Sequence, residues 1–151
     1  MAVEKGIKHV MIDSMVKCGV DSERNEPQKN FISKLQDIAK EHKIHIHLVH
    51  HTRKTQNETD IQDKYSVKGA GEIVDLTDNL IIVQRNKKKE FELMNNKSLD
   101  TIEYHEANPD CFLTVSKQRH GDFEGRFAFW FDKDSTQWCE FPDKRKMVFV
   151  K

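Results

Sequence analysis

The order of apolar and amphipathic runs between residues 7 and 50 restricts the fold more than any other feature of the chain. Ile7 to Ile12 is predicted to form a strand, Asn25 to about His42 a helix, and Lys43 to His50 a second strand. The apolar residues of the helical run fall on one face: Phe31, Ile32, Leu35, Ile38 and Ala39. This order predicts a parallel pair of strands joined by a right-handed helical crossover.

Two local patterns in this segment carry further expectations. Asn25, with Gln28 three residues later, is expected to cap the helix. In the second strand, His45 and His47 face the same way, opposite the apolar face made by Ile44, Ile46 and Leu48. Two such histidines could ligate a metal, but that requires a third convergent ligand. Solvated histidines are therefore the expected state.

Ionisable side chains follow both strands directly. Asp13 ends the segment His-Val-Met-Ile-Asp-Ser, and His51 follows the second strand. Because open α/β sheets bind ligands at the carboxyl ends of their strands, we expect Asp13 and His51 to lie side by side at such an edge. Taken alone, Asp13 is equally compatible with a metal-associated role and with an ordinary turn. For His51 taken alone, a solvated or hydrogen-bonded histidine is the more common state.

A long polar segment separates this unit from the rest of the chain. Thr52 to Val67 consists mostly of Thr, Gln, Asn, Asp and Lys, which predicts a loop that is long for a compact domain. Loops of this length are usually functional or mobile. Lys68 to Gly71 then forms a turn that opens a short predicted helix, Glu72 to Thr77.

The remaining sequence predicts mainly strands. Leu80 to Val83 gives the clearest buried-strand signal, whereas residues 85–110 are expected to be loop with short irregular elements. A pair of strands joined by a turn at Gly121 to Gly125, and two closing strands, are expected at Phe112 to Lys117, Arg126 to Phe131, Trp138 to Phe141 and Met147 to Val150. The expected fold class is α/β, with parallel strands and helices first and antiparallel strands last.

Two cations mark the end of the Phe112 to Lys117 strand. Lys117 and Arg119 are two residues apart, so they should project to the same side and present two positive charges to one anion. A solvated basic strand end is the simpler alternative.

Composition excludes several classes of protein. The 25 basic and 25 acidic residues among 151 cancel, so any contact with nucleic acid must come from local clusters of charge. Three widely spaced cysteines argue against a disulfide framework and fit a reducing cytosol. No apolar run approaches the roughly 18 residues of a membrane span, so no membrane partner is expected.

Four short motifs occur in order along the chain: Asp13 after its strand, His51 in Leu-Val-His-His-Thr-Arg-Lys, Lys68-Gly69-Ala70-Gly71 before a helix, and Lys117-Gln118-Arg119 followed by Gly121 and Gly125. Together they resemble the RecA-type motor domain of hexameric replicative helicases, which include bacterial DnaB-type helicases, phage primase-helicases and mitochondrial Twinkle. The resemblance runs from about Val3 to Trp138. It implies a single, partial RecA-like P-loop NTPase core over residues 1–151 that uses ATP and Mg²⁺ and works in the cytoplasm of a bacterial host.

The resemblance implies a role for each motif. Asp13 matches the Walker B acid, which holds Mg²⁺ through water, and with Ser14 it would border the nucleotide. His51 matches the residue that senses the γ-phosphate. Lys117 and Arg119 match the element that reaches ATP bound to the neighbouring subunit of a hexameric ring. Single-stranded DNA would contact the polar loop and the turn after it, through Arg53, Lys54, Lys64, Lys68 and Gly69.

The chain departs from the family in two respects. Many members have Gln where this sequence has Asp75, so a contact made by that glutamine is altered. The P-loop and the glutamate that polarises water precede the Walker B strand in the family, and both are missing from this chain, which begins twelve residues before Asp13. We therefore expect no ATP hydrolysis by this chain alone.

Three interpretations remain. The first is the carboxy-terminal part of a phage or prophage helicase or primase-helicase. The second keeps the RecA-like fold but assigns a recombinase or a plasmid-replication ATPase, although Lys117-Gln118-Arg119 favours the helicase. The third is a catalytically inactive, truncated module that only binds a partner.

Overall fold

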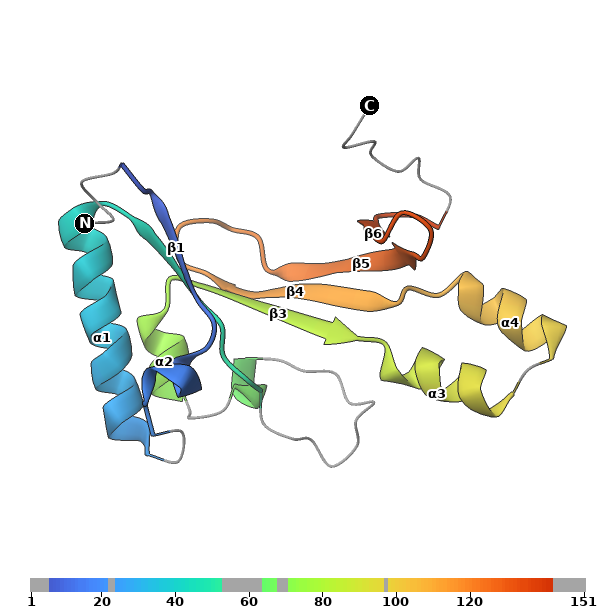
Figure 1. Cartoon of the computed structure of the whole chain (residues 1–151), viewed down its shortest axis with the longest axis horizontal. Coiled ribbons are helices and arrows are strands. Elements are labelled where there is room, and N and C mark those ends of the chain that lie inside the picture. Colours follow the sequence, from blue (N-terminus) through green and yellow to red (C-terminus); the bar gives the residue numbers. More distant parts are fainter. Residues whose placement is uncertain (1–5, 22–23, 53–63, 68–70, 97, 143–151) are drawn as a thin grey trace. The chain divides into compact units, whose positions relative to one another are not determined.

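A computed structural model describes residues 6–21, 24–52, 64–67, 71–96 and 98–142, which form a mixed α/β structure (Figure 1). The chain divides into two compact units. The first comprises residues 1–54 and 64–78, and the second comprises residues 55–63 and 79–151. The expectation of a single domain stays a prediction.

The first unit contains the predicted strand, helix and strand. Strands β1 (His9–Ile12) and β2 (His45–Leu48) pair in parallel, with His9 opposite His45 and Ile12 opposite Leu48. Helix α1 (Asn25–His42) connects them and packs against β2 (Figure 1). A 3₁₀ turn, η2 (Met15–Cys18), follows β1. The parallel pair and the connecting helix confirm the prediction from sequence.

A small apolar core holds this unit together. Ile32 of α1 is buried with Met15, and the short helix α2 (Gly71–Leu76) buries Ile73 and Val74. The side chain of Gln36 donates a hydrogen bond to the backbone carbonyl of Leu76, which ties α2 to α1. A second 3₁₀ turn, η3 (Lys64–Ser66), precedes α2.

The predicted helix cap is wrong. Arg24, in an extended conformation, occupies the position before the helix, and no side chain there caps a backbone amide. Asn25 is already helical. Gln28 is fully buried and donates from Nε2 to the carbonyl of Asp21 at 3.1 Å, so it holds the preceding loop instead. Pro27, in the first turn, has no N–H that would need a cap.

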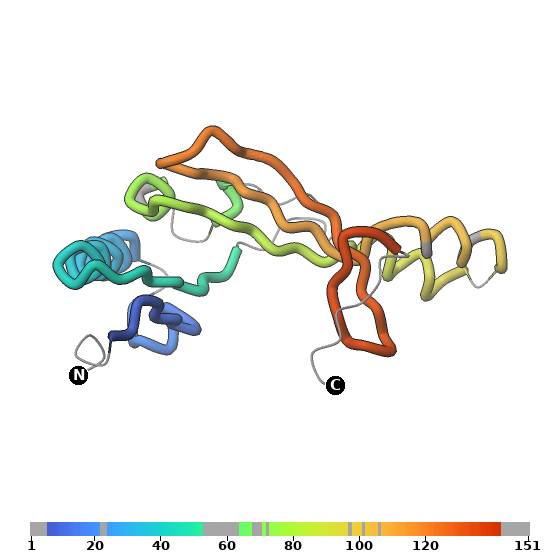
Figure 2. The backbone as a smooth tube through the Cα atoms, turned by 90° about the horizontal axis from the view of Figure 1, so that it is seen from above, coloured from blue at the N-terminus to red at the C-terminus, as the bar shows by residue number. Residues whose placement is uncertain are grey.

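The second unit is built on an antiparallel sheet of four strands. Its strands follow the order β3 (Asn79–Arg85), β4 (Cys111–Gln118), β5 (Gly125–Asp132) and β6 (Gln137–Cys139). Figure 2 shows β3, β4 and β5 running side by side. The predicted antiparallel strands are thereby confirmed, except for residues 147–150, which lie outside the described residues.

Strand β3 is not the buried strand that its sequence predicts. Ile82 is buried, but Ile81 and Val83 are 55% and 69% exposed. Successive side chains of a strand point to opposite faces, and only the face that carries Ile82 is covered. An unbroken apolar run therefore does not prove burial on both faces.

Residues 85–110 form two helices where a mostly irregular loop was expected. Helix α3 (Lys87–Asn95) and helix α4 (Leu99–Glu106) extend beyond one end of the sheet (Figure 1). The side chain of Asn86 accepts a hydrogen bond from the backbone N–H of Lys89 and so caps α3. Several of their apolar side chains are exposed, which obscured the helical periodicity: Phe91, Met94, Leu99 and Tyr104.

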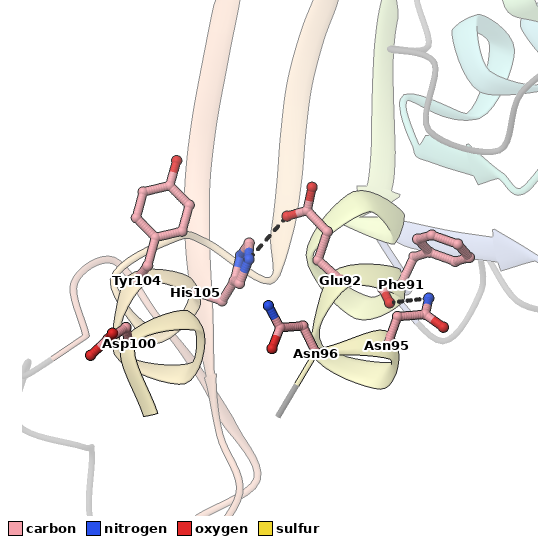
Figure 3. Close-up of a pocket in the computed structure, with 7 residues that line it drawn as sticks. All are labelled: Phe91, Glu92, Asn95, Asn96, Asp100, Tyr104 and His105. Carbon is pink, nitrogen blue, oxygen red and sulfur yellow. Dashed lines mark hydrogen bonds and ion pairs between the residues drawn. The ribbon is translucent and has the colours of Figure 1, made fainter. Parts of the chain in front are cut away.

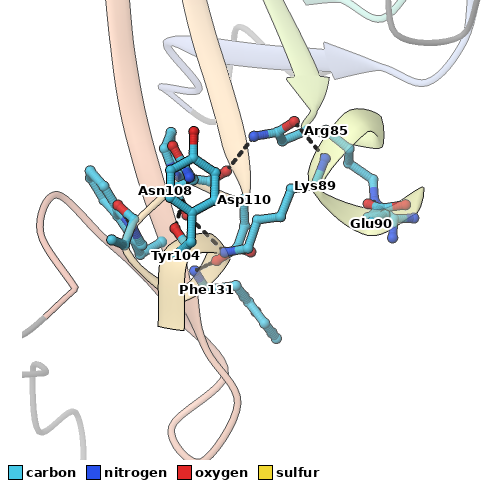
Figure 4. A network of polar contacts seen from close by, with 11 residues as sticks. Arg85, Lys89, Glu90, Tyr104, Asn108, Asp110 and Phe131 are labelled. Carbon is cyan, nitrogen blue, oxygen red and sulfur yellow. Dashed lines mark hydrogen bonds and ion pairs between the residues drawn. The ribbon is translucent and has the colours of Figure 1, made fainter. Parts of the chain in front are cut away.

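A buried lysine fastens α3 to the sheet (Figure 4). Lys89 Nζ lies 2.6 Å from Asp110 Oδ1 and donates to the carbonyl of Asn108 at 2.7 Å. The other carboxylate oxygen of Asp110 accepts from the backbone N–H of Phe131 at 2.8 Å. Asn86 adds a hydrogen bond from Nδ2 to the carbonyl of Pro109. One ion pair therefore links α3, the start of β4 and strand β5.

Replacing Lys89 with Met should destabilise this unit, because the side chain of Lys89 is only 8% exposed and its removal leaves Asp110 without its cation. We expect a loss of about 3 kcal/mol in the free energy of unfolding, measured by urea denaturation. Lys88→Met is the matched control, since Lys88 is exposed on the same helix. Equal unfolding midpoints for the two variants would contradict the role of the ion pair.

Candidate functional site

Asp13 lies at the carboxyl end of the parallel pair. The carbonyl of Ile12 accepts a hydrogen bond from Val49 at 2.9 Å, and Met15 donates to the carbonyl of Val49 at 3.2 Å. These bonds continue the pairing past the ends of β1 and β2 and enclose Asp13 between them along the chain. The side chain of Asp13 is exposed, Ser14 is buried, and the peptide bond that joins them is cis. An exposed carboxylate at this edge can hold a hydrated cation.

His51 is also exposed and also lies beyond the end of its strand. The register places the backbone of Val49 beside Asp13, and His51 follows two residues later. Both predicted residues are thus at the same edge of the sheet, as expected. Their direct juxtaposition stays a prediction.

The polar loop is described only near its ends. Thr52 and Val67 form an antiparallel bridge that closes it. Lys64 lies in η3 with its Nζ 5.7 Å from the ring centroid of Tyr65, which is 78% exposed. The other residues expected to contact DNA lie outside the described residues: Arg53, Lys54, Lys68 and Gly69.

Lys117 and Arg119 lie at the far end of β4 in the second unit. Lys117 is half-buried within the strand opposite Leu80, and Arg119 is exposed in the turn that follows. A Cβ atom at Gly121 would come within 2.7 Å of the Gln118 side chain, so this turn is closely folded. The motif Lys117-Gln118-Arg119 therefore spans the end of a β-strand and the start of a hairpin turn.

The predicted site residues fall into two sets. Asp13, Ser14 and His51 belong to the first unit, and Lys117 and Arg119 to the second. Within each set, the residues lie at a strand end or just beyond it. An approach of one set to the other, within one subunit or between two, stays a prediction.

A pocket lies between α3 and α4, and the sequence did not indicate it (Figure 3). His105 is buried there, and its Nε2 lies 3.0 Å from the Glu92 carboxylate. Asn95, Asn96 and Asp100 add polar groups, and Phe91 and Tyr104 complete the lining. Glu92 and His105 satisfy one another and join the two helices, so we interpret the pair as structural. The sequence signal that could have found it is the cap at Asn86, which defines α3.

The cysteines do not form a reactive centre. Cys18 is exposed, whereas Cys111 and Cys139 are buried, and all three are free thiols. Burial raises the pKa of the Cys111 thiol, an effect that its hydrogen bonds with the backbone of Gln84 and Phe112 partly oppose. A raised pKa lowers the fraction of the nucleophilic thiolate, so Cys111 is unsuited to act as a nucleophile.

Across the described ranges, no group of three or more His, Cys, Asp and Glu side chains is arranged to hold a metal ion as it stands. In the same part of the chain, no helix has both the length and the apolar character needed to span a bilayer. No protein-family model matches the sequence, and no curated protein matches it significantly.

The difference in burial predicts the order of thiol reactivity. With Ellman's reagent at pH 8, the exposed thiol of Cys18 should react at least about tenfold faster than the buried thiols of Cys111 and Cys139. All three thiols should react quickly after denaturation. Cys18→Ser should remove the fast phase. If Cys111→Ser removed it instead, the assigned burial of Cys111 would be wrong.

Proposed function

We propose that this chain is part of the motor of an ATP-dependent replicative DNA helicase, of the phage helicase or primase-helicase type. The single observation that carries the proposal is the parallel β1–α1–β2 unit, which puts Asp13 at the carboxyl end of a strand and leads from the neighbouring strand to His51. Open α/β sheets bind nucleotides at this edge. The order of the later motifs, ending in Lys117 and Arg119 at β4, supports a helicase over a recombinase or a plasmid-replication ATPase.

The residues fit Mg²⁺ and ATP in chemical type. An exposed carboxylate such as Asp13 suits a hydrated Mg²⁺, because this ion retains several waters and prefers oxygen ligands. Bound Mg²⁺ would neutralise charge on the phosphates. Asp13 would orient its waters, and Ser14 would border the phosphates.

The second set of residues would act between subunits. Arg119 would place its guanidinium against the γ-phosphate held by a neighbouring copy, and Lys117 would add a second positive charge. Charge that develops on the phosphate is stabilised by such fixed cations, which can raise the rate by roughly 10³ to 10⁵. Hydrolysis would then depend on assembly into a ring.

His51 would link the nucleotide to DNA. Its position next to Thr52 makes it the last residue before the bridge that closes the polar loop. A change in hydrogen bonding at His51 on loss of the γ-phosphate would therefore reach the loop through one residue. Arg53 and Lys68 adjoin the bridged pair in sequence, and Lys54 follows Arg53. With Lys64 and Gly69, these residues would contact single-stranded DNA.

Binding to single-stranded DNA tests the loop assignment in this chain. Labelled oligothymidylate should bind with a Kd on the order of 10⁻⁵ M at low salt, as measured by fluorescence anisotropy. The double variant Arg53→Ala/Lys54→Ala should weaken binding and lower the slope of log K against log salt by about 1.4. Lys29→Ala/Lys34→Ala removes two exposed charges from α1 and should leave the slope unchanged. Equal effects of the two double variants would contradict the assignment.

The role of Arg119 is testable in an ATPase-active form of the protein that includes a phosphate-binding loop. Arg119→Ala should lower ATP turnover by roughly 10³-fold, with nucleotide affinity nearly unchanged. His120→Ala, in the same exposed turn, is the control.

Mixing variants shows whether Arg119 acts in a neighbouring subunit. Asp13→Ala and Arg119→Ala proteins should each be inactive, and an equal mixture should regain activity at interfaces that combine one intact Asp13 with one intact Arg119. If the mixture remains inactive although mixed rings form, action between subunits is refuted.

A further inference from the structure

Three histidines lie together on one face of the parallel pair, where the sequence had indicated only two. His9 is opposite His45 in the register of β1 and β2, and His47 lies two residues after His45 on the same face. The ring centroids are 4.3 Å apart for His45 and His47, 5.5 Å for His9 and His47, and 5.7 Å for His9 and His45. All three side chains are exposed. His9 therefore places a third imidazole beside the pair on β2.

We propose that His9, His45 and His47 form a binding site for a first-row transition-metal ion, with Zn²⁺ as the reference ion. Each histidine would supply one imidazole nitrogen, which is a preferred ligand of these ions. Three histidines with an open fourth position form a known class of zinc site. The inference concerns this chain's first unit alone, and it does not depend on the proposed helicase function.

Two of the three ligands are already at the right separation. His9 Nδ1 and His47 Nε2 lie 3.2 Å apart. Two nitrogen ligands of a tetrahedral zinc ion, each about 2.0–2.1 Å from the metal, would be separated by about 3.3 Å. The same pair can share a hydrogen bond without metal, which holds the two rings close together before an ion arrives.

His45 must move to complete the site. In the present side-chain positions, the three histidines do not form a group that can hold a metal ion. His45 is exposed and stands on the same face as both other rings, so a rotation of its side chain is the movement that the site requires. Exposed side chains exchange rotamers within nanoseconds, so this rearrangement is no kinetic barrier.

The fourth position can be filled by water or by a thioether. Met11 is paired with His47 in the register, on the same face, and is 72% exposed. Its sulfur is a soft ligand that would favour copper over zinc. Mg²⁺ prefers oxygen ligands, and the side chains of Met11 and the three histidines offer none. The site is thereby distinct in chemistry from the carboxylate at Asp13.

A bound ion would cross-link β1 to β2. The two strands share only four paired positions in the described sheet, so a metal that bridges them would add a second connection. Because the unfolded chain does not present the three histidines together, binding should stabilise the folded unit in proportion to the logarithm of the metal concentration.

Calorimetric titration with ZnCl₂ tests the site, in a Cys18→Ser background that removes the exposed thiol. We expect one zinc ion per chain at pH 7.5, with a Kd of about 10⁻⁵ M or tighter. His9→Gln and His47→Gln should each weaken binding at least about tenfold. His42→Gln and His120→Gln alter exposed histidines elsewhere and should have no effect.

A second readout separates metal ligation from a structural role of these histidines. Co²⁺ bound by three nitrogens and a fourth ligand gives intense visible absorption typical of tetrahedral coordination, which His47→Gln should abolish while the circular dichroism spectrum stays unchanged. Equal zinc affinity of the parent and the triple His→Gln variant, or absence of these cobalt bands from the parent, would overturn the proposal.

Discussion

The parallel pairing of β1 with β2 is the constraint on which the first unit depends. Parallel strands require a crossover connection, and α1 provides it, so the register from His9 with His45 to Ile12 with Leu48 fixes what lies at the ends and on the faces. One end carries Asp13 and leads toward His51. One face carries three histidines, and α1 packs against β2. A shift of one residue in this register would move every side chain of the strand to the opposite face and would disperse both features.

The sequence predicts most of the elements, because their patterns are local. Helix α1 follows from an apolar stripe of five residues, and the strands that flank it follow from short apolar runs. Helices α3 and α4 were missed because their apolar residues, among them Phe91 and Met94, are exposed rather than gathered on a buried stripe. The capping of α1 was misjudged because Gln28 bonds to Asp21, a tertiary contact that spacing does not reveal.

The candidate sites divide in the same way. Strand ends could be read from the sequence, so Asp13, His51 and Lys117 were assigned to the correct places in their elements. His9 was not recognised as a neighbour of His45 and His47, since nothing in a single sequence gives the register between two strands. The Lys89–Asp110 ion pair also could not be predicted from the sequence. It joins residues 21 positions apart, and helices α3 and α4 in that stretch of the chain were not predicted.

The exposed face of β3 has a consequence for the behaviour of the protein in solution. Ile81 and Val83 pair with Val115 and Leu113 of β4, and Leu113 pairs in turn with Phe127, so one face of the sheet carries a continuous apolar strip. Each square ångström of such a surface gains about 25 cal/mol when it leaves water. Salts that are excluded from protein surfaces strengthen this gain. Sulfate or phosphate should therefore salt the protein out at concentrations that a chain with a fully polar surface would tolerate.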